Sequence, residues 1–497
     1  MAFTGEAHDE KDFADVVQVS PALEEATADS REKDRRLLRK IDLHVMPLLM
    51  ITYGIQYSDK ISLSSGAIFD LRSDTHLVGN QYAWLTTIFY LAYLIGEFPV
   101  AYLMQRFRID RILAYCVLVW GICVLCLAAC NNFRDRGILG FAESTVSPGF
   151  LIIVTAWYKR EEQTVRVMLF FMMNSVFSLW VLMCCYGIGK ASTGSSLSPW
   201  RAINIFLGAL SLLWGFVMVW QLGTPAHVKW LTDEDRELLR VRLLANKDGE
   251  HESGVKVKWN QVWECFRDPQ IYFQFVFMFL LCTASGGITS FSAIIVNSFG
   301  FAPAESLALQ LPWYFLQTSF IVGIIFVFRR YPNRNWSLLI SIIAMMPAIL
   351  GIFLEGLLPK SAKWGRLIGF WITGPYVISQ FLMMTTFSQN IAGRTKKSVA
   401  QALTFVSYCL GFLVGPQFFW ASSAPDYKPG LYTTAVCFVL IEVILICWFF
   451  WARSVNKARD RVVREKGMSE EAAEAEGRSM GEQDLTDRQN PHFRYRY

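Results

Sequence analysis

The chain has 497 residues, of which 53% are hydrophobic, 15% are aromatic and only 18% are charged. The apolar residues occur in long blocks, a pattern typical of a protein whose main solvent is lipid. The small net charge of +5, and the position of most of the eleven cysteines inside apolar blocks, argue against a nucleic-acid-binding protein, a disulfide scaffold and a metal site.

The apolar blocks are long enough to cross a bilayer, since a hydrocarbon core of about 30 Å needs about 20 apolar residues per helix. Water cannot satisfy free backbone groups inside lipid, so each block is predicted to be a helix. Twelve spans are predicted, at Val45–Ser64, Gln81–Met104, Ile112–Cys130, Gly137–Tyr158, Val167–Gly189, Ala202–Leu222, Ile271–Val296, Leu309–Phe328, Trp336–Leu358, Leu367–Phe387, Val399–Trp420 and Leu431–Trp451.

A polar and charged stretch, Gly223–Gln270, divides these spans six and six. It contains a helix-start signal, Thr232 followed by Asp235 three residues later. The predicted organisation is an N-terminal tail (1–40), a first six-helix half (41–222), a central loop (223–270), a second six-helix half (271–452) and a C-terminal tail (453–497). Both tails are polar, and their composition indicates mostly solvated segments.

The distribution of lysine and arginine predicts that both tails and the central loop are cytoplasmic. With this orientation most of the 47 basic residues fall inside, and short inner loops carry three each, as in Arg329, Arg330 and Arg334. The predicted outer loop Phe299–Ala308 carries none, whereas Pro359–Arg366 carries three and is an exception.

Short motifs in a fixed order identify a relationship. They are Tyr57-Ser58-Asp59-Lys60, Glu97-Phe98-Pro99, Trp157-Tyr158-Lys159-Arg160-Glu161-Glu162-Gln163 with Arg166, Asn390-Ile391-Ala392-Gly393-Arg394-Thr395-Lys396-Lys397, and a tail with Asp484-Leu485-Thr486-Asp487 and Asn490-Pro491-His492-Phe493-Arg494-Tyr495. Together they resemble the fungal allantoate permease family, in the anion:cation symporter group of the major facilitator superfamily. The tail is the most specific of these matches.

The resemblance implies an all-α membrane protein with the major facilitator fold, about twelve transmembrane helices in two six-helix halves. It also implies proton-coupled uptake of a small organic anion, such as allantoate, ureidosuccinate, nicotinate, pantothenate or a short peptide. A monomer in the plasma membrane, without cofactors, is expected. An efflux transporter of the same superfamily and a non-transporting nutrient sensor are the alternatives, and no enzyme motif is present.

Two stretches depart from the family pattern. In the predicted fourth span, Asn132-Phe133 is followed almost at once by Arg134-Asp135-Arg136, so about two helical turns are missing. Either divergence or a misplaced splice boundary explains this shortening. The middle of the fifth span, Met172–Cys185, lacks glycine, so altered packing is expected in the first half.

Charge inside a bilayer is costly, so the few charged residues of the spans are functional candidates. Arg136 and Lys60 are the candidates for binding the anion, because a transporter of anions needs a fixed positive charge. The competing interpretation of Lys60 is an ion pair with its neighbour Asp59 or contact with the membrane interface. Proton coupling is assigned to three carboxyl groups, although each could instead join two helices: Glu143, Asp59 and Glu97. Asn174, Tyr376 and Gln380 are further candidates for solute contact, and Glu442 is expected to have a packing role.

Mixed charges lie at two predicted junctions between a helix and a cytoplasmic loop. Such charges can form ion pairs that hold one state of a transporter and break in another. The predicted cytoplasmic gate comprises Arg160, Glu161, Glu162, Arg166, Arg106 and Arg111. Topology signalling and contact with lipid headgroups are the alternative roles of these residues.

Overall fold

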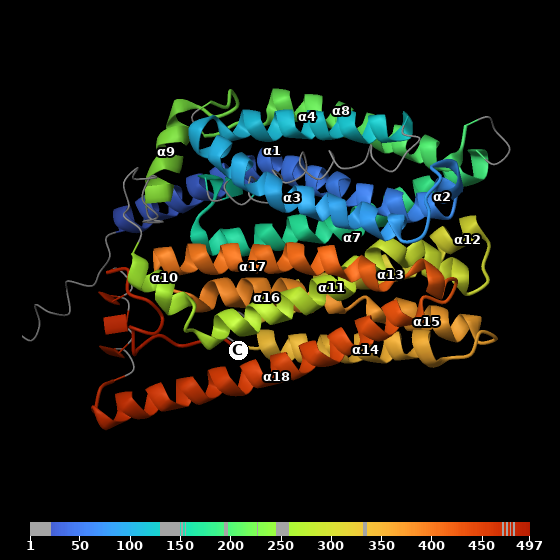
Figure 1. Cartoon of the computed structure of the whole chain (residues 1–497). Helices are drawn as coiled ribbons and strands as arrows, with labels where there is room; N and C mark the ends of the chain where they lie inside the picture. Colours follow the sequence, from blue (N-terminus) through green and yellow to red (C-terminus); the bar gives the residue numbers. More distant parts are fainter. Residues whose placement is uncertain are drawn as a thin grey trace, which may run out of the picture.

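The computed structural model describes residues 21–129, 150, 153–154, 156–192, 197–225, 227–244, 258–331, 335–469, 472–473, 476–477, 479–480 and 483–497. Within these residues all regular elements are helices, and the long ones lie side by side (Figure 1). Residues 483–497 and the helices α9 (Asp233–Leu244) and α10 (Trp259–Cys265) lie at one end of the bundle, the tail end. The opposite, far end carries α2 (Leu71–Asp74) and α12 (Pro303–Ala308).

Two groups of long helices flank α9 and α10 in the sequence. The N-terminal half contains α1 (Pro21–Ala67), α3 (Gln81–Arg106), α4 (Ile109–Ala129), α7 (Arg160–Ser192) and α8 (Pro199–Gln221), together with α2. Besides α12, the C-terminal half contains α11 (Pro269–Ser298), α13 (Leu311–Arg330), α14 (Ser337–Leu357), α15 (Lys363–Thr373), α16 (Tyr376–Asn390), α17 (Arg394–Val414), η3 (Gly415–Phe418), η4 (Ala421–Ser423) and α18 (Lys428–Glu465).

Ten helical segments of the described chain are long and apolar enough to cross a membrane, and they match all the predicted spans except the first and the fourth. The predicted first span lies within α1, where polar side chains such as Asp59 and Lys60 lower the hydropathy. The predicted fourth span lies mostly outside the described residues. The shortened stretch Asn132–Arg136, where about two turns are missing relative to the family pattern, also lies outside them. The predicted tenth span is divided into α15 and α16 at Gly374 and Pro375.

The central stretch contributes one helix to each half. Thr232 caps α9 as predicted: its hydroxyl accepts from the Asp235 N–H at 3.2 Å, and the Asp235 carboxylate accepts from the Thr232 N–H at 3.3 Å. Lys40 of α1 pairs with Asp235 at 2.6 Å, so α9 is attached to the N-terminal half. By contrast, α10 packs against α17 of the C-terminal half.

The end of the chain is not a solvated tail, and this corrects the prediction for residues 484–497. Thr486, Asp487 and Tyr495 are almost completely buried. Two asparagines of the helices hold the backbone: Asn390 pairs with the backbone of Arg496, and Asn456 pairs with that of Tyr495. These paired bonds resemble those between two strands. The Tyr495 ring also packs on Trp451 of α18, with ring centres 5.2 Å apart, so hydrogen bonds and an aromatic contact together order this segment.

The missing glycines of the predicted fifth span are compensated on the opposite helix. Gly54 of α1 faces Phe177 of α7, and a Cβ at Gly54 would overlap the Phe177 ring. Ser175 and Ser178 are buried in α7. The small residue that lets two membrane helices approach closely is therefore on α1 rather than on α7.

Replacing Gly54 with Leu should reduce the amount of folded protein, because a side chain forced into this contact costs about 1–3 kcal/mol or more. The amount that elutes as a single species in gel filtration, at equal expression, measures the effect. Gly187→Leu is the matched control, since Gly187 lies on α7 with open space around its Cβ position. Equal recovery of the two variants would contradict the assigned helix contact.

Candidate functional site

The two halves are joined by hydrogen bonds from the middle of the bundle to its far end. The Ser64 hydroxyl of α1 lies 2.9 Å from the Ser292 hydroxyl of α11. Tyr82 of α3 donates to the Ser290 carbonyl at 2.7 Å, and Thr87 donates to the Leu413 carbonyl at 2.9 Å. The far end is therefore closed by direct contact between the halves.

Among the described residues, each ion pair at the tail end joins two residues of the same half, and none joins one half to the other. Arg166 of α7 donates twice to the Asp42 carboxylate of α1, at 2.8 Å each. Glu162 pairs with Arg242 of α9, which also lies 3.1 Å from Asp34 of α1. This pattern is that of a bundle closed at its far end, with its halves held separately at the tail end.

The predicted gate residues take different positions in this conformation. Glu162 and Arg166 join α1, α7 and α9 as described above, and none of these pairs crosses to the C-terminal half. The Arg106 guanidinium is exposed, 5.6 Å from the centre of the Tyr102 ring, and Arg111 is exposed. The side chains of Arg160 and Glu161 lie outside the described residues. The gating role of these residues stays a prediction.

Asp59 and Lys60 are adjacent in α1 but contact different helices. The Trp120 indole of α4 donates to Asp59 Oδ2, and Asp59 Oδ1 is buried without a hydrogen bond among the described residues. The Lys60 ammonium lies among three rings, 5.6 Å from the centre of Tyr57, 6.0 Å from Phe89 and 5.9 Å from Tyr90. The structure thus places a carboxyl group and a cation side by side within the bundle.

Lys60 lies next to a contact between the two halves. Tyr90 of α3, one of the three rings around its ammonium group, stacks on Phe412 of α17 with ring centres 4.5 Å apart. A cation at this position is partly surrounded by aromatic faces, which attract it electrostatically. Movement of α17 relative to α3 would therefore change the surroundings of Lys60.

The neutral candidates lie on helices that meet near the middle of the bundle. Phe171 of α7 stacks on Phe381 of α16, with ring centres 5.1 Å apart. Asn174 follows Phe171 by about one helical turn, and its buried Oδ1 has no hydrogen bond among the described residues. Gln380 precedes Phe381 and is half-buried. Asn174 and Gln380 thus lie on the two helices, one from each half, that this pair of rings brings into contact.

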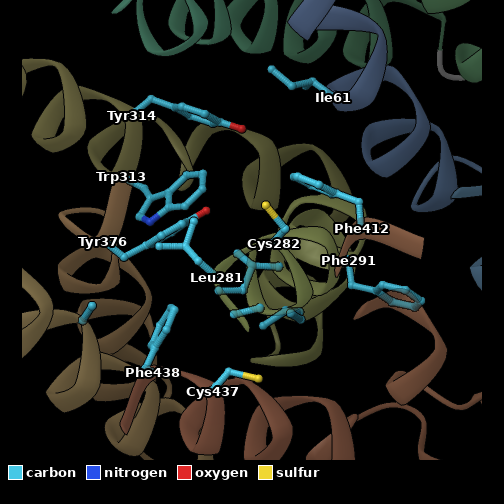
Figure 2. Packing of buried hydrophobic residues seen from close by; sticks show 14 of the residues in the cluster. Ile61, Leu281, Cys282, Phe291, Trp313, Tyr314, Tyr376, Phe412, Cys437 and Phe438 are labelled. Carbon is cyan, nitrogen blue, oxygen red and sulfur yellow. The ribbon is translucent and has the colours of Figure 1, made fainter. Parts of the chain in front are cut away.

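Tyr376 lies at the start of α16 and is almost completely buried. Its hydroxyl is 3.0 Å from the hydroxyl of Ser285 on α11. Figure 2 shows the hydroxyl ends of Tyr376 and Tyr314 directed toward the region of Cys282, on the same α11 helix. The side chain therefore joins α11 to α16 within the C-terminal half.

The remaining charged candidates are resolved to different degrees. Arg136 and Glu143 lie outside the described residues, so their roles stay predictions. Glu97 of α3 is half-buried, and its Oε2 is buried without a hydrogen bond among the described residues. Glu442 of α18 is buried, and neither of its carboxylate oxygens has a hydrogen bond in the described chain.

The sequence interpretation missed a buried charge cluster at the tail end, which we call the Lys396 cluster. The Lys396 ammonium is completely buried and contacts three carboxylates, Glu264 at 3.0 Å, Asp268 at 2.6 Å and Asp487 at 2.8 Å. Tyr495 donates to Asp487 at 2.8 Å. Burial raises the pKa of Asp487, and the opposing charge of Lys396 limits that rise. The motifs at 390–397 and 484–495, which match the pattern of the family, were the available signal.

Comparisons with known proteins agree with this arrangement. Residues 49–416 match the family described as Major Facilitator Superfamily. An uncharacterized transporter of Schizosaccharomyces pombe is 32% identical over 98% of this chain and 92% of its own length. The allantoate permease of Saccharomyces cerevisiae is 32% identical over 93% of this chain and 87% of its own length. A thiamine pathway transporter of the same yeast is 30% identical over 94% and 87%.

Solved structures show the same fold at low sequence identity. The xylose transporter XylE of Escherichia coli, in a partially occluded inward open conformation, has a TM-score of 0.60 at 12% identity and covers 82% of this chain and 99% of its own. A bacterial homolog of the human lysosomal transporter Spinster has a TM-score of 0.58 at 15% identity, over 82% and 96%.

Proposed function

This chain belongs to the major facilitator superfamily and is a membrane transporter of small solutes, and we propose that it takes up a small organic anion together with protons. The observation that carries the proposal is the position of Lys60, a cation inside the bundle beside the buried carboxyl group of Asp59. Similarity to an allantoate permease supports a carboxylate as the solute.

We place the tail end on the cytoplasmic side of the plasma membrane, as the distribution of basic residues predicts. The contacts at the far end then close the pathway to the outside, and the separate ion-pair networks of the two halves face the cytoplasm. Transporters of this kind work by rocking one half against the other around a site near the middle of the membrane. The described conformation corresponds to the state that releases solute inward.

The anion binds near Lys60, and Tyr376, Gln380 and Asn174 are proposed to set its orientation. A carboxylate gains a charge-assisted hydrogen bond from the ammonium group, and amide and hydroxyl groups satisfy the rest of the solute. Displacement of the aromatic rings from Lys60 by the solute would disturb the contact between Tyr90 and Phe412. Binding is thereby linked to movement of α17 against α3.

Asp59 is proposed to couple this binding to protons. An ionised Asp59 beside Lys60 offsets the positive potential that attracts the solute, whereas a protonated Asp59 leaves that potential available. Proton and anion therefore favour each other's binding, which is the energetic requirement for symport. Glu97, whose Oε2 is buried without a hydrogen bond in the described chain, and Glu143 are the other candidates for carrying a proton.

Uptake by yeast cells that express the chain tests this function directly. Radiolabelled allantoate, nicotinate, pantothenate and a dipeptide would be offered at acidic and neutral external pH. Accumulation of at least one solute should be higher in acid and should collapse when a protonophore is added. Accumulation that persists with the protonophore, or export of preloaded solute driven by a proton gradient, would contradict the proposed symport.

A further inference from the structure

The short helix α10 turns one aromatic face outward. Trp259, Trp263 and Phe266 follow a spacing of four and three residues, which places them on one side of a helix. Trp259 is 69% exposed and Trp263 is 64% exposed. The opposite side is buried, with Gln261 accepting hydrogen bonds from the Thr395 and Lys396 N–H groups at 3.1 and 3.2 Å.

The aromatic face continues onto α11. The Tyr272 hydroxyl donates to the Phe266 carbonyl at 2.6 Å, and the exposed Tyr272 is followed one turn later by the exposed Val276. Trp259, Trp263, Phe266, Tyr272 and Val276 thus form one exposed apolar surface, which we call the α10 face.

The position of α11 shows which way this surface points. The Phe273 ring of α11 stacks on Trp448 of α18, with ring centres 6.0 Å apart. The Phe275 carbonyl accepts a hydrogen bond from the Ser407 hydroxyl of α17. Ser292 of α11 contacts α1, in the other half. On a helix with 3.6 residues per turn, Tyr272 and Val276 fall between the sides that meet α17 and α18, away from the side that meets α1. The α10 face therefore points to the outer circumference of the bundle, which lipid surrounds.

We propose that the α10 face is a membrane anchor that inserts into the interface between lipid headgroups and acyl chains at the tail end. Tryptophan and tyrosine favour this depth because their rings are apolar and their N–H and O–H groups remain near water. The exposed Arg267 follows α10 directly and can contact lipid phosphates. The partner is the lipid surface, because the α10 face continues onto Tyr272 and Val276, which are exposed at the tail end of the membrane-spanning helix α11.

The buried side of α10 connects the anchor to the Lys396 cluster. Gln261 bonds to the backbone of α17 and to the Asp484 carbonyl at 2.9 Å, and Glu264 pairs with Lys396. The anchor consequently holds the tail ends of α11 and α17 and residues 484–487 at one depth in the membrane. The N-terminal half, by contrast, can rock against it.

Photolabelling of the full-length protein in liposomes tests the anchor. The liposomes contain phosphatidylcholine, a small part of which carries a diazirine near the glycerol end of one acyl chain. After irradiation, adducts are located by mass spectrometry of peptides. We expect adducts within residues 259–266, at a yield comparable with that of exposed Tyr102 at the tail end of α3 and well above that of exposed residues in α9. Labelling of Tyr102 without labelling of residues 259–266 would overturn the proposal. It would show that the α10 face contacts water or another protein instead of lipid.

A variant series separates the anchor from a general effect on folding. The triple substitution W259S/W263S/F266S should lower lipid adducts in this segment several-fold while adducts at Tyr102 remain. Trp220→Ser, which removes a still more exposed tryptophan from α8, should leave labelling of residues 259–266 unchanged. Gel filtration confirms that each variant is folded. Unchanged labelling in a folded triple variant would show that the three rings do not determine the depth of α10.

Discussion

Replacing Lys396 with Met should lower the melting temperature of the purified transporter by about 10 °C, because loss of one partner from a buried ion pair costs about 3–5 kcal/mol. The substitution leaves Glu264, Asp268 and Asp487 together without the cation that they share. Thermal unfolding followed by intrinsic fluorescence in a mild detergent measures the change. Lys457→Met, on the exposed surface of α18, is the matched control and should have little effect.

Residues 484–497 should contribute to the stability of the protein about as much as Lys396 does. Removal of residues 484–497 takes away Asp487 and the backbone groups that Asn390 and Asn456 bind, so it should destabilise the protein to a similar extent. A truncated protein with the melting temperature of the full chain would show that the tail follows the helices without stabilising them. In that case a loss in Lys396→Met would be assigned to Glu264 and Asp268 alone.

The effect of Lys396→Met should also depend on pH, with a definite sign. Burial already raises the pKa of Asp487, and removing the nearby positive charge raises it further. A carboxyl group whose pKa is higher in the folded state stabilises that state below its unfolded pKa and loses this contribution as pH rises through the folded pKa. The variant should therefore regain part of its stability as pH falls, and an equal deficit at all pH values would contradict the assignment.

Hydropathy predicted the membrane-spanning helices because the bilayer imposes both their length and their composition. The predicted spans Gln81–Met104 and Ile271–Val296 lie inside α3 and α11. Two helices extend well beyond their predicted spans: charged, helix-forming residues lengthen α1 at its start and α18 at its end, outside the lipid. The break in the predicted tenth span, between α15 and α16, was not predicted. Gly374-Pro375 was the available signal, because proline cannot donate the backbone hydrogen bond of a helix interior.

Composition could not predict the ordered tail, since polarity alone does not distinguish a solvated segment from one held by specific hydrogen bonds. Residues 484–497 are ordered by Asn390, Asn456 and Lys396, which lie up to about a hundred residues away in the sequence. The candidate site was found only in part for a related reason. The cost of charge inside a bilayer identified Asp59 and Lys60 as candidates, but it could not show that they contact different helices.

Replacing Lys60 with Gln should reduce uptake of the solute by about a hundredfold. The substitution removes the cation that pairs with the solute carboxylate, and loss of one partner from a buried, hydrogen-bonded charge pair costs about 2–5 kcal/mol. The loss should appear at every pH, because the glutamine amide carries no charge at any of them. Initial uptake rates, corrected for transporter at the cell surface, give the effect. Glu442→Gln is the control, because Glu442 is a buried carboxyl group of α18 outside the proposed binding region.

Replacing Asp59 with Asn should give the opposite combination of properties. The neutral amide imitates a protonated carboxyl group, so Lys60 would attract the anion without a bound proton. Exchange of solute across the membrane should continue, whereas accumulation against a gradient and its dependence on external pH should be lost. Counterflow in proteoliposomes measures exchange, and a proton gradient of fixed size measures accumulation. If Asp59→Asn still accumulates solute in a pH-dependent way, Glu97 or Glu143 carries the proton. If both Lys60→Gln and Asp59→Asn transport normally, the anion binds elsewhere and the proposed site is wrong.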